Sequence, residues 1–227
     1  MDERELAIYT PADAARYLGI HPSTLATWIH GRNYKTAADV RFFAPVINIA
    51  DPDNRLLSFF NLAEAHVLAA FRYEHRVKFP AIRKALDTVA ARYPSKHPLI
   101  SRDFFTNGKD LFFKTAIENE NLSTPEQTNL REIMTAFLVH VGRDKDKLAE
   151  RIFPIIKGQP QDKVISIVHG VASGAPIIDG TGVPVWIIHG RKERGESPIS
   201  IAKDFGIPVA KVKRAIEYVE NREQIAA

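Results

Sequence analysis

The chain has 227 residues, of which 45% are hydrophobic and 26% are charged, and its formal net charge at pH 7 is +4. These values are typical of globular domains with an ample core, and the length accommodates one large domain or two to three small ones. The absence of cysteine excludes disulfides and thiolate metal sites and suits the cytoplasm. The acidic, polar start of the chain predicts no signal peptide, and no apolar run approaches the ~20 residues of a membrane span.

Residues 9–32 predict two short helices joined by a tight turn, which is the arrangement of a helix-turn-helix. Thr10 is a good N-cap for the first helix, and Gly19 supplies the left-handed residue at its end. Ala15 allows the two helices to cross closely, and Leu25 fills the angle between them. The alternative is an ordinary helical hairpin within a core, but every inward position fits a helix-turn-helix.

The outward face of the second helix is short and polar, as suits a helix that enters the major groove of DNA. No Asp or Glu occurs between Ala14 and Ala38, so nothing in this stretch repels phosphate. We expect the short side chains to read bases and the nearby cations to hold phosphates. The predicted base-contacting residues are Ser23, Thr24, Thr27 and His30, and the predicted phosphate-contacting residues are Arg32, Lys35 and Arg41.

A β-hairpin and two helices are predicted to follow. The expected segments are strands over 40–49 and 56–60 around a turn at 51–54, and helices over 61–77 and 80–93. Asn61 is the expected N-cap of the first of these helices, with Glu64 as its capping-box partner. A hairpin directly after a recognition helix is the wing of a winged helix. The basic outer faces of the two helices are either a solvated surface or a DNA contact.

This order of elements resembles a MerR-type winged helix-turn-helix over about the first 95 residues. The residues that carry the resemblance are Tyr9-Thr10-Pro11, Ala15, Gly19, Ser23-Thr24-Leu25, and Ser58-Phe59 leading into Asn61-Leu62. MerR proteins usually follow the Thr-Leu pair with an arginine that contacts the DNA backbone, and Ala26 stands at that place here. No long coiled-coil heptad run follows, so the chain departs from a standard MerR dimer.

The middle of the chain carries no DNA-binding signature. Asn107-Gly108 between aromatic segments predicts a second hairpin within residues 95–118. A helix is expected over 122–141, ended by Gly142, and a short charged helix over 144–151. Residues 153–163 are expected to connect this part to the next. We expect residues 96–163 to form the interface of a homodimer.

From Val164 the chain changes character. A strand over 164–168 and a hairpin turning at Asp179-Gly180, between the apolar runs 174–178 and 183–188, are expected. The glycines lack the lysine and hydroxyl residue that end a P-loop, so they do not predict a phosphate site. Residues 197–220 then repeat the opening unit. The repeated spacing places Ala202, Gly206 and Val212 where the first unit has Ala15, Gly19 and Leu25, and its outward cations are Lys211, Lys213 and Arg214. These cations are either DNA contacts or the outer face of a structural helix pair.

The C-terminal part resembles a small domain of unknown function that is common in bacterial antitoxins. The matching segments are Gly174-Ala175-Pro176-Ile177-Ile178-Asp179-Gly180-Thr181-Gly182-Val183-Pro184-Val185 and Gly195-Glu196-Ser197. The family usually has an arginine where Gly182 stands, so no role of that arginine is carried over. With the N-terminal unit included, nearly the whole chain resembles the long VapB-type antitoxins. This resemblance implies an N-terminal DNA-binding helix-turn-helix and a PIN-like ribonuclease toxin as partner.

No pattern in the sequence supports catalysis or a bound cofactor. His66 and His75 are too far apart for the ligand pair of a helical zinc site, and no nucleophile elbow of the form G-x-S-x-G occurs. Glu118 and Glu120 form a carboxylate pair, but they lie in a polar stretch that would not raise a pKa. We therefore predict no enzyme, no cofactor and no metal.

Together these patterns predict an α+β, mainly helical fold with three parts. The parts are a winged helix-turn-helix over 1–95, a middle hairpin-and-helix segment over 96–163, and a hairpin with a second helix-turn-helix over 164–227. The predicted function is a bacterial, cytoplasmic, DNA-binding antitoxin that neutralises a PIN-like toxin and represses its own operon. Two alternatives stay open: a stand-alone MerR-like regulator that senses a small ligand, and a protein-interaction module that no longer binds DNA.

Overall fold

The computed structural model describes residues 2–35, 39–73, 79–104, 108–118, 124–155 and 162–226. Over these residues the fold is α+β and mainly helical, as predicted. The α-helices are α1 (Pro11–Leu18), α2 (Pro22–His30), α3 (Phe59–Tyr73), α4 (Phe79–Arg92), α5 (Lys109–Glu118), α6 (Thr124–Val139), α7 (Val185–Glu193), α8 (Pro198–Phe205) and α9 (Val209–Ala226). The strands are β1 (Arg32–Lys35), β2 (Val40–Phe43), β3 (Val141–Arg143), β4 (Ala149–Ile152), β5 (Ile165–Val168) and β6 (Ile177–Ile178). The short 3-10 helices are η1 (Glu3–Glu5), η2 (Pro98–Ile100) and η4 (Ala172–Gly174).

Helices α1 and α2 form the predicted helix-turn-helix. The side chain of Thr10 accepts a hydrogen bond from the Asp13 backbone N–H at 3.0 Å and so caps α1. Gly19 follows α1 in the left-handed conformation, with φ of +66°. Ala15 and Leu25 are both buried where the helices cross. Local sequence signals are sufficient here because the cap, the turn and the crossing contact each join residues that are close in the chain.

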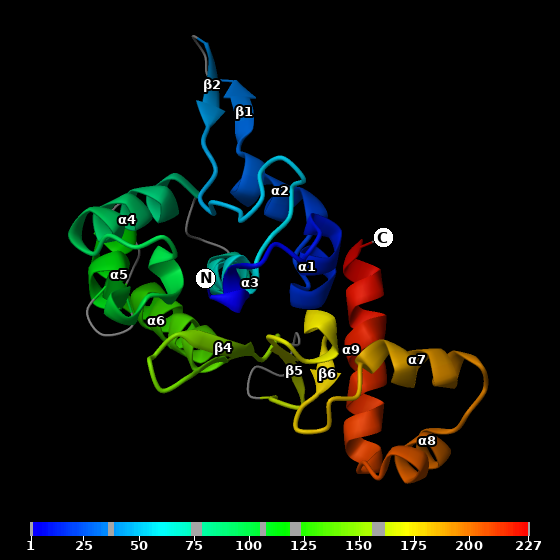
Figure 1. The fold of residues 1–227 in the computed structure, drawn as a ribbon. Coiled ribbons are helices and arrows are strands. Elements are labelled where there is room, and N and C mark those ends of the chain that lie inside the picture. The colour runs from blue at the N-terminus through cyan, green and yellow to red at the C-terminus, as the bar shows by residue number, and fades with distance from the viewer. Residues whose placement is uncertain are drawn as a thin grey trace.

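A two-stranded antiparallel hairpin follows α2, but it is not the hairpin that the sequence predicted. Strand β1 pairs with β2, with Arg32 opposite Phe43, and the hairpin projects from the body beyond α2 (Figure 1). In the segment 51–60, Leu56 makes one bridge with Asp51, and Phe59 already begins α3. Strand β1 is exposed along its whole length, so it carries none of the alternation that marks a half-buried strand. This explains why the sequence did not indicate it.

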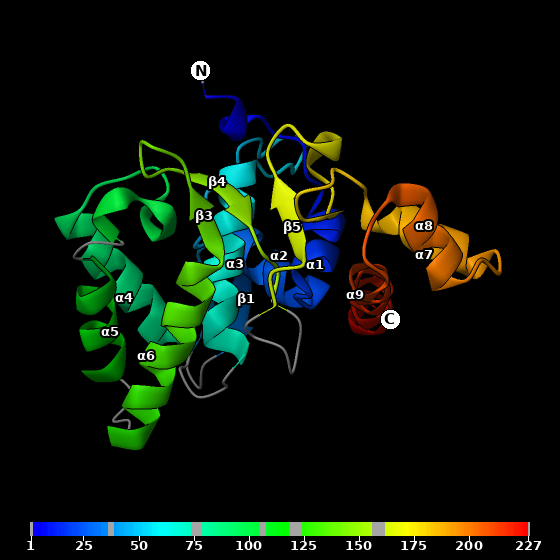
Figure 2. The same ribbon diagram turned by 90° about the horizontal axis from the view of Figure 1, so that it is seen from below.

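Helix α3 runs through the middle of the molecule, between α1 on one side and α4 and α6 on the other (Figure 2). Its start is fixed by Ser58 and Asn61, since each side chain accepts a hydrogen bond from the other's backbone N–H. The predicted roles of Asn61 as N-cap and Glu64 as capping-box partner are therefore wrong. Glu64 is instead buried and bonded to His97.

The middle segment is helical where a second hairpin was predicted. Asn107 lies outside the described residues, but Gly108 leads directly into α5, which packs along α4. The aromatic segments on either side of Asn107-Gly108 are not strands, because Phe104 and Phe112 belong to two helical segments that meet with their rings 6.0 Å apart. The predicted helix over 122–141 corresponds to α6.

A β-hairpin replaces the short helix that was predicted over 144–151. Gly142 lies in β3 and does not end α6. The side chain of Asp144 accepts hydrogen bonds from the backbone N–H groups of Asp146 and Leu148, both at 2.9 Å, and Lys147 is left-handed with φ of +66°. A turn stabilised in this way outweighs the modest helical tendency of a charged run.

The strands β3, β4, β5 and β6 form one antiparallel sheet in that order, so the sheet joins the middle of the chain to its C-terminal part. The predicted strand at 164–168 is confirmed as β5. Only the first half of the predicted hairpin at Asp179-Gly180 is a strand, because Val185 begins α7. Val185 and Ile188 are buried three residues apart on this helix, which is the helical period within an apolar run.

The second helix-turn-helix, α8 and α9, is also confirmed. Ser197 caps α8, and Gly206 ends it with φ of +65°. Helix α9 then continues well past the unit, and its C-terminal half lies against α1 (Figure 1). The Tyr218 hydroxyl donates to the Tyr17 carbonyl at 2.5 Å. The two helix-turn-helix units are therefore held against each other through the last turns of one helix.

Two clusters of buried side chains form the core. The larger one extends from Tyr9 to Ile167 around α3, and the smaller one extends from Ile165 to Tyr218 between β5, β6 and the last three helices. The division of the chain at 95/96 and 163/164 stays a prediction. None of the helices within the described ranges is long and apolar enough to span a bilayer.

Candidate nucleic-acid interface

An open cleft of about 590 Å³ lies between α2, the β1–β2 hairpin and the start of α4. Hydroxyl groups from α2 form one wall, and aromatic side chains from the hairpin form the other. None of the lining residues that the structure describes is acidic. The lining residues are Ser23, Thr24, Thr27, Trp28, Arg32, Tyr34, Phe42, Phe43, Ala44, Pro80 and Arg83.

The predicted base-contacting residues lie on the outer side of α2. Ser23, Thr24 and Thr27 all line the cleft, and His30 is exposed at the end of the helix. The Thr27 hydroxyl donates to the Ser23 carbonyl at 2.9 Å. His21 caps the helix through the Ser23 backbone N–H. Three of the four predicted residues thus share one surface of one helix.

The predicted phosphate-contacting residues of the first unit lie on the hairpin. Arg32 is exposed and lines the cleft, and Lys35 is exposed at the far end of β1. Arg41 lies in β2 opposite Tyr34, and its side chain is outside the described part of the structure. An arginine at the mouth of an acid-free cleft suits a polyanion that passes between helix and hairpin.

Sequence reasoning missed several lining residues. Tyr34, Phe42 and Phe43 come from the hairpin whose position was predicted wrongly. Arg83 comes from α4, where a basic face could not be told apart from an ordinary solvated one. The signal that could have found the hairpin was the cluster of β-prone residues at 40–43, paired with the polar run before it.

The predicted contacts in the second unit lie elsewhere. Lys211, Lys213 and Arg214 are near the start of α9, at the end of this helix that is far from α2 (Figure 1). The Lys211 ammonium donates to the Asp179 carbonyl at 3.3 Å, and Arg214 pairs with Asp162 and Glu217, both at 2.5 Å. Lys213 is exposed. The structure does not bring these three side chains to the cleft beside α2.

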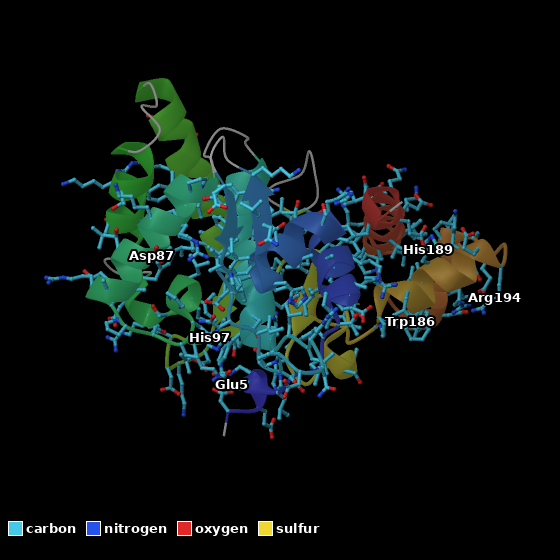
Figure 3. The ribbon with its side chains drawn as sticks, turned by 90° about the horizontal axis from the view of Figure 1, so that it is seen from above. Glu5, Asp87, His97, Trp186, His189 and Arg194 are labelled. Atoms are coloured by element: carbon cyan, nitrogen blue, oxygen red, sulfur yellow. The ribbon has the colours of Figure 1, made fainter. Side chains whose placement is uncertain are left out.

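The Gly195-Glu196-Ser197 segment has a structural role in this fold. Hydrogen bonds from Arg191 hold the pKa of the Glu196 carboxyl below its ordinary value, and the same guanidinium pairs with Asp204 on α8 at 2.5 Å. Ser197 caps α8. Trp186 on α7 and Arg194, which directly follows this helix, are both exposed and are labelled in Figure 3. Among the described residues no group of three or more His, Asp or Glu side chains could hold a metal ion.

Comparisons with known proteins match both ends of the chain. Residues 7–86 match a family described as "Putative DNA-binding HTH domain", and residues 165–219 match a family described as "Protein of unknown function (DUF433)". The chain is 28% identical to "Putative antitoxin VapB45" of Mycobacterium tuberculosis, over 95% of each chain. It is 24% identical to "Uncharacterized protein Rv2308" of the same organism, over 97% of this chain and 92% of that one.

A solved structure has the same fold. The crystal structure of Rv2018 from Mycobacterium tuberculosis superposes with a TM-score of 0.67 at 26% identity, covering 93% of this chain and 98% of that one. Together with the sequence matches at both ends, this confirms the predicted resemblance to VapB-type antitoxins over nearly the whole chain.

Proposed function

We propose that this chain, which resembles a VapB-type antitoxin, binds double-stranded DNA of its own promoter as a homodimer, represses its operon and neutralises a PIN-like ribonuclease toxin. The observation that carries the DNA-binding part is the cleft beside α2. It combines exposed Ser23 and half-buried Thr24 and Thr27 with an exposed arginine, and it has no described acidic side chain. It also lies within the segment that matches a DNA-binding helix-turn-helix family.

Docking follows from the shape of this surface. Helix α2 enters the major groove with Ser23, Thr24 and Thr27 toward the bases, because short side chains allow the helix to approach closely. The hairpin acts as a MerR-like wing. It lies over the sugar-phosphate backbone beside that groove, so that Arg32 holds a phosphate and Lys35 and Arg41 add charge. Residues 1–95 form this DNA-binding part.

The second unit contributes less to DNA binding. Lys211 and Arg214 already have partners within the chain, and α9 is fixed against α1 by Tyr218. Of the three predicted contacts, Lys213 alone is exposed without a partner that the structure describes. We assign this unit to holding the chain together and to partner binding.

Replacing Arg32 with alanine tests the DNA contact. Wild-type affinity for its own promoter fragment is expected to fall steeply with salt, and Arg32→Ala is expected to reduce the slope by about one, since one phosphate contact is lost. Fluorescence anisotropy at several salt concentrations measures this. Lys213→Ala is the matched control and should shift the slope little. A wild-type chain that fails to bind at low salt refutes the proposal.

A dimer is expected because one recognition helix reads too few bases for useful specificity. Analytical ultracentrifugation of the full chain should find it, with residues 96–163 as the interface. A monomer at all concentrations contradicts this part of the proposal alone.

The interaction-module alternative has one specific observation in its favour. Ala26 occupies the place where the resemblance to MerR proteins implies an arginine that contacts DNA. On that view the chain binds its toxin without binding DNA. Co-purification with the product of a neighbouring toxin gene, together with no DNA binding at low salt, would support it. If the chain is instead a stand-alone regulator that senses a small ligand, no toxin gene is expected beside its own gene.

A further inference from the structure

Arg83 on α4 reaches across to the base of the β1–β2 hairpin. Its Nη2 donates to the backbone carbonyls of Ala44 and Pro45, the latter at 2.7 Å. Its guanidinium carbon lies 4.8 Å from the centre of the Phe43 ring. One side chain therefore contacts three consecutive residues at the end of β2.

The same stretch of chain is held from the other side by α2. The backbone N–H groups of Val46 and Ile47 donate to the Trp28 carbonyl at 2.8 and 3.1 Å. At Gly31, which has φ of +72°, an added Cβ would lie 2.1 Å from the Phe43 carbonyl oxygen. The base of the hairpin is therefore held by α2 on one side and, through Arg83, by α4 on the other.

We propose that Arg83 is a positioning residue that fixes the hairpin over the cleft and couples the α4–α5 pair to the DNA-binding surface. This rests on the proposed function. Helix α4 packs along α5, so any partner that displaces these helices would move the hairpin relative to α2. The coupling makes the α4–α5 pair a place from which DNA binding can be regulated.

The geometry favours positioning over direct phosphate contact. Nη2 already serves two carbonyls, and Nε is buried with no hydrogen-bond partner in the described structure. The remaining nitrogen, Nη1, lies 3.9 Å from the Asp87 carboxylate, which would repel phosphate. A planar guanidinium is needed because it can donate to carbonyls while it stacks on a ring, which a lysine ammonium does less well.

Tryptophan fluorescence gives a readout that needs no DNA. The chain has two tryptophans. Trp28 is 2% exposed and lines the cleft, whereas Trp186 is 62% exposed on α7. In a full-length Trp186→Phe parent, acrylamide quenching therefore reports only on Trp28 and on how firmly the hairpin covers it.

In this parent, Arg83→Gln and Arg83→Lys are both expected to increase quenching of Trp28. Both should also weaken promoter binding about tenfold without changing the salt slope, because each loses charge-assisted bonds to the hairpin. Phe43→Leu removes the stacking ring from the hairpin side and should act in the same direction, which covers the case of an Arg83 variant that does not fold. Asp87→Asn is the matched control for the quenching measurement and should leave quenching of Trp28 unchanged, since Asp87 does not contact the hairpin carbonyls.

The opposite pattern overturns the proposal. If Arg83→Lys behaves like the parent, and Arg83→Gln lowers the salt slope by about one with unchanged quenching, then Arg83 contacts phosphate directly. If the parent itself does not bind promoter DNA, the proposed function fails, but quenching still decides the role of Arg83. If quenching of Trp28 is then unchanged in Arg83→Gln, Arg83→Lys and Phe43→Leu, Arg83 does not fix the position of the hairpin.

Discussion

Replacing Gly19 with alanine is expected to destabilise the protein far more than the same change at Gly206. The two glycines end the first helix of their helix-turn-helix units with nearly equal φ, +66° and +65°. A left-handed alanine costs about 1 kcal/mol at either place. An added Cβ meets nothing within 4 Å at Gly206, whereas at Gly19 it would lie 2.0 Å from Nη1 of Arg222.

Arg222 can move aside only by giving up the contacts that hold its guanidinium. Its side chain is 2% exposed, its Nη2 donates to the Ile155 carbonyl at 2.7 Å, and its guanidinium lies over the Tyr218 ring. Loss of a buried charge-assisted hydrogen bond adds about 1.5–3 kcal/mol, so we expect about 3 kcal/mol or more for Gly19→Ala in total. Urea denaturation of the full chain measures the difference.

A double-mutant cycle with Arg222→Ala isolates the cause. In the Arg222→Ala chain, Gly19→Ala and Gly206→Ala should lower the free energy of unfolding by amounts that agree within about 0.5 kcal/mol, because the guanidinium that crowds Gly19 is gone. If the two substitutions lower the free energy of unfolding equally in the wild-type chain, then Arg222 of α9 does not pack against Gly19 as it does in this structure.

The helix-turn-helix units could be predicted from sequence because their determinants are local. Thr10 and Ser197 each cap a helix of eight residues, and a left-handed glycine directly follows each of these helices. The crossing residues Ala15 and Ala202 lie in the first helix of each unit, and the filling residues Leu25 and Val212 lie in the second. Sequence periodicity and capping rules detect contacts at this range.

The elements that were missed depend on distant partners. Glu64 was interpreted as a capping residue because its partner His97 cannot be inferred from spacing. Nothing in the sequence connects Arg222 with Gly19 or Arg83 with the hairpin. The apolar run at 185–188 has both strand and helix character, and packing against α9 decides it in favour of helix.

The candidate site was predictable to the same extent. Ser23, Thr24, Thr27 and Arg32 follow from the local helix-turn-helix frame, and the structure places all four on one cleft. The aromatic wall of that cleft was missed, because β1 is polar and fully exposed and the position of the hairpin depends on contacts with α2 and α4. The DNA contacts themselves stay predictions.

His97→Phe is expected to lower the free energy of unfolding strongly. His97 belongs to an ionic cluster that joins η1, near the N-terminus, to α3. His97 Nδ1 lies 2.9 Å from Glu64 Oε2, and His97 Nε2 lies 3.1 Å from Glu5 Oε2. Lys96 pairs with the same Glu5 oxygen at 2.7 Å. Glu5 and His97 lie close together in Figure 3.

The pKa directions in this cluster set the expected pH dependence. Burial opposes the charge on His97, but the bonds to Glu64 and Glu5 outweigh it and raise the His97 pKa above 6.5. Burial raises the Glu64 pKa above 4.5, and His97 offsets this only partly. In both cases the folded state holds its proton more tightly than the unfolded state. The corresponding stability is full below the unfolded pKa and is lost as pH rises through the folded one.

His97→Phe keeps a ring where His97 contacts Phe60 but leaves the Glu64 carboxylate buried without its partner. We expect a loss of about 3–5 kcal/mol at pH 7.5, as for other broken buried pairs. Glu64→Gln in the same chain should recover a large part of it, because the buried amide carries no charge.

The pH profile distinguishes this account from a packing defect. The wild-type free energy of unfolding should decline as pH rises above 6.5, through titration of His97, and His97→Phe should lack that decline. The variant should instead gain stability as pH falls toward 5, because Glu64 then takes up a proton. Urea denaturation between pH 5 and 9 tests both, with exposed His30→Ala expected to stay within about 0.5 kcal/mol of wild type. Parallel profiles for His97→Phe and wild type would show that the cluster carries no net charge coupling.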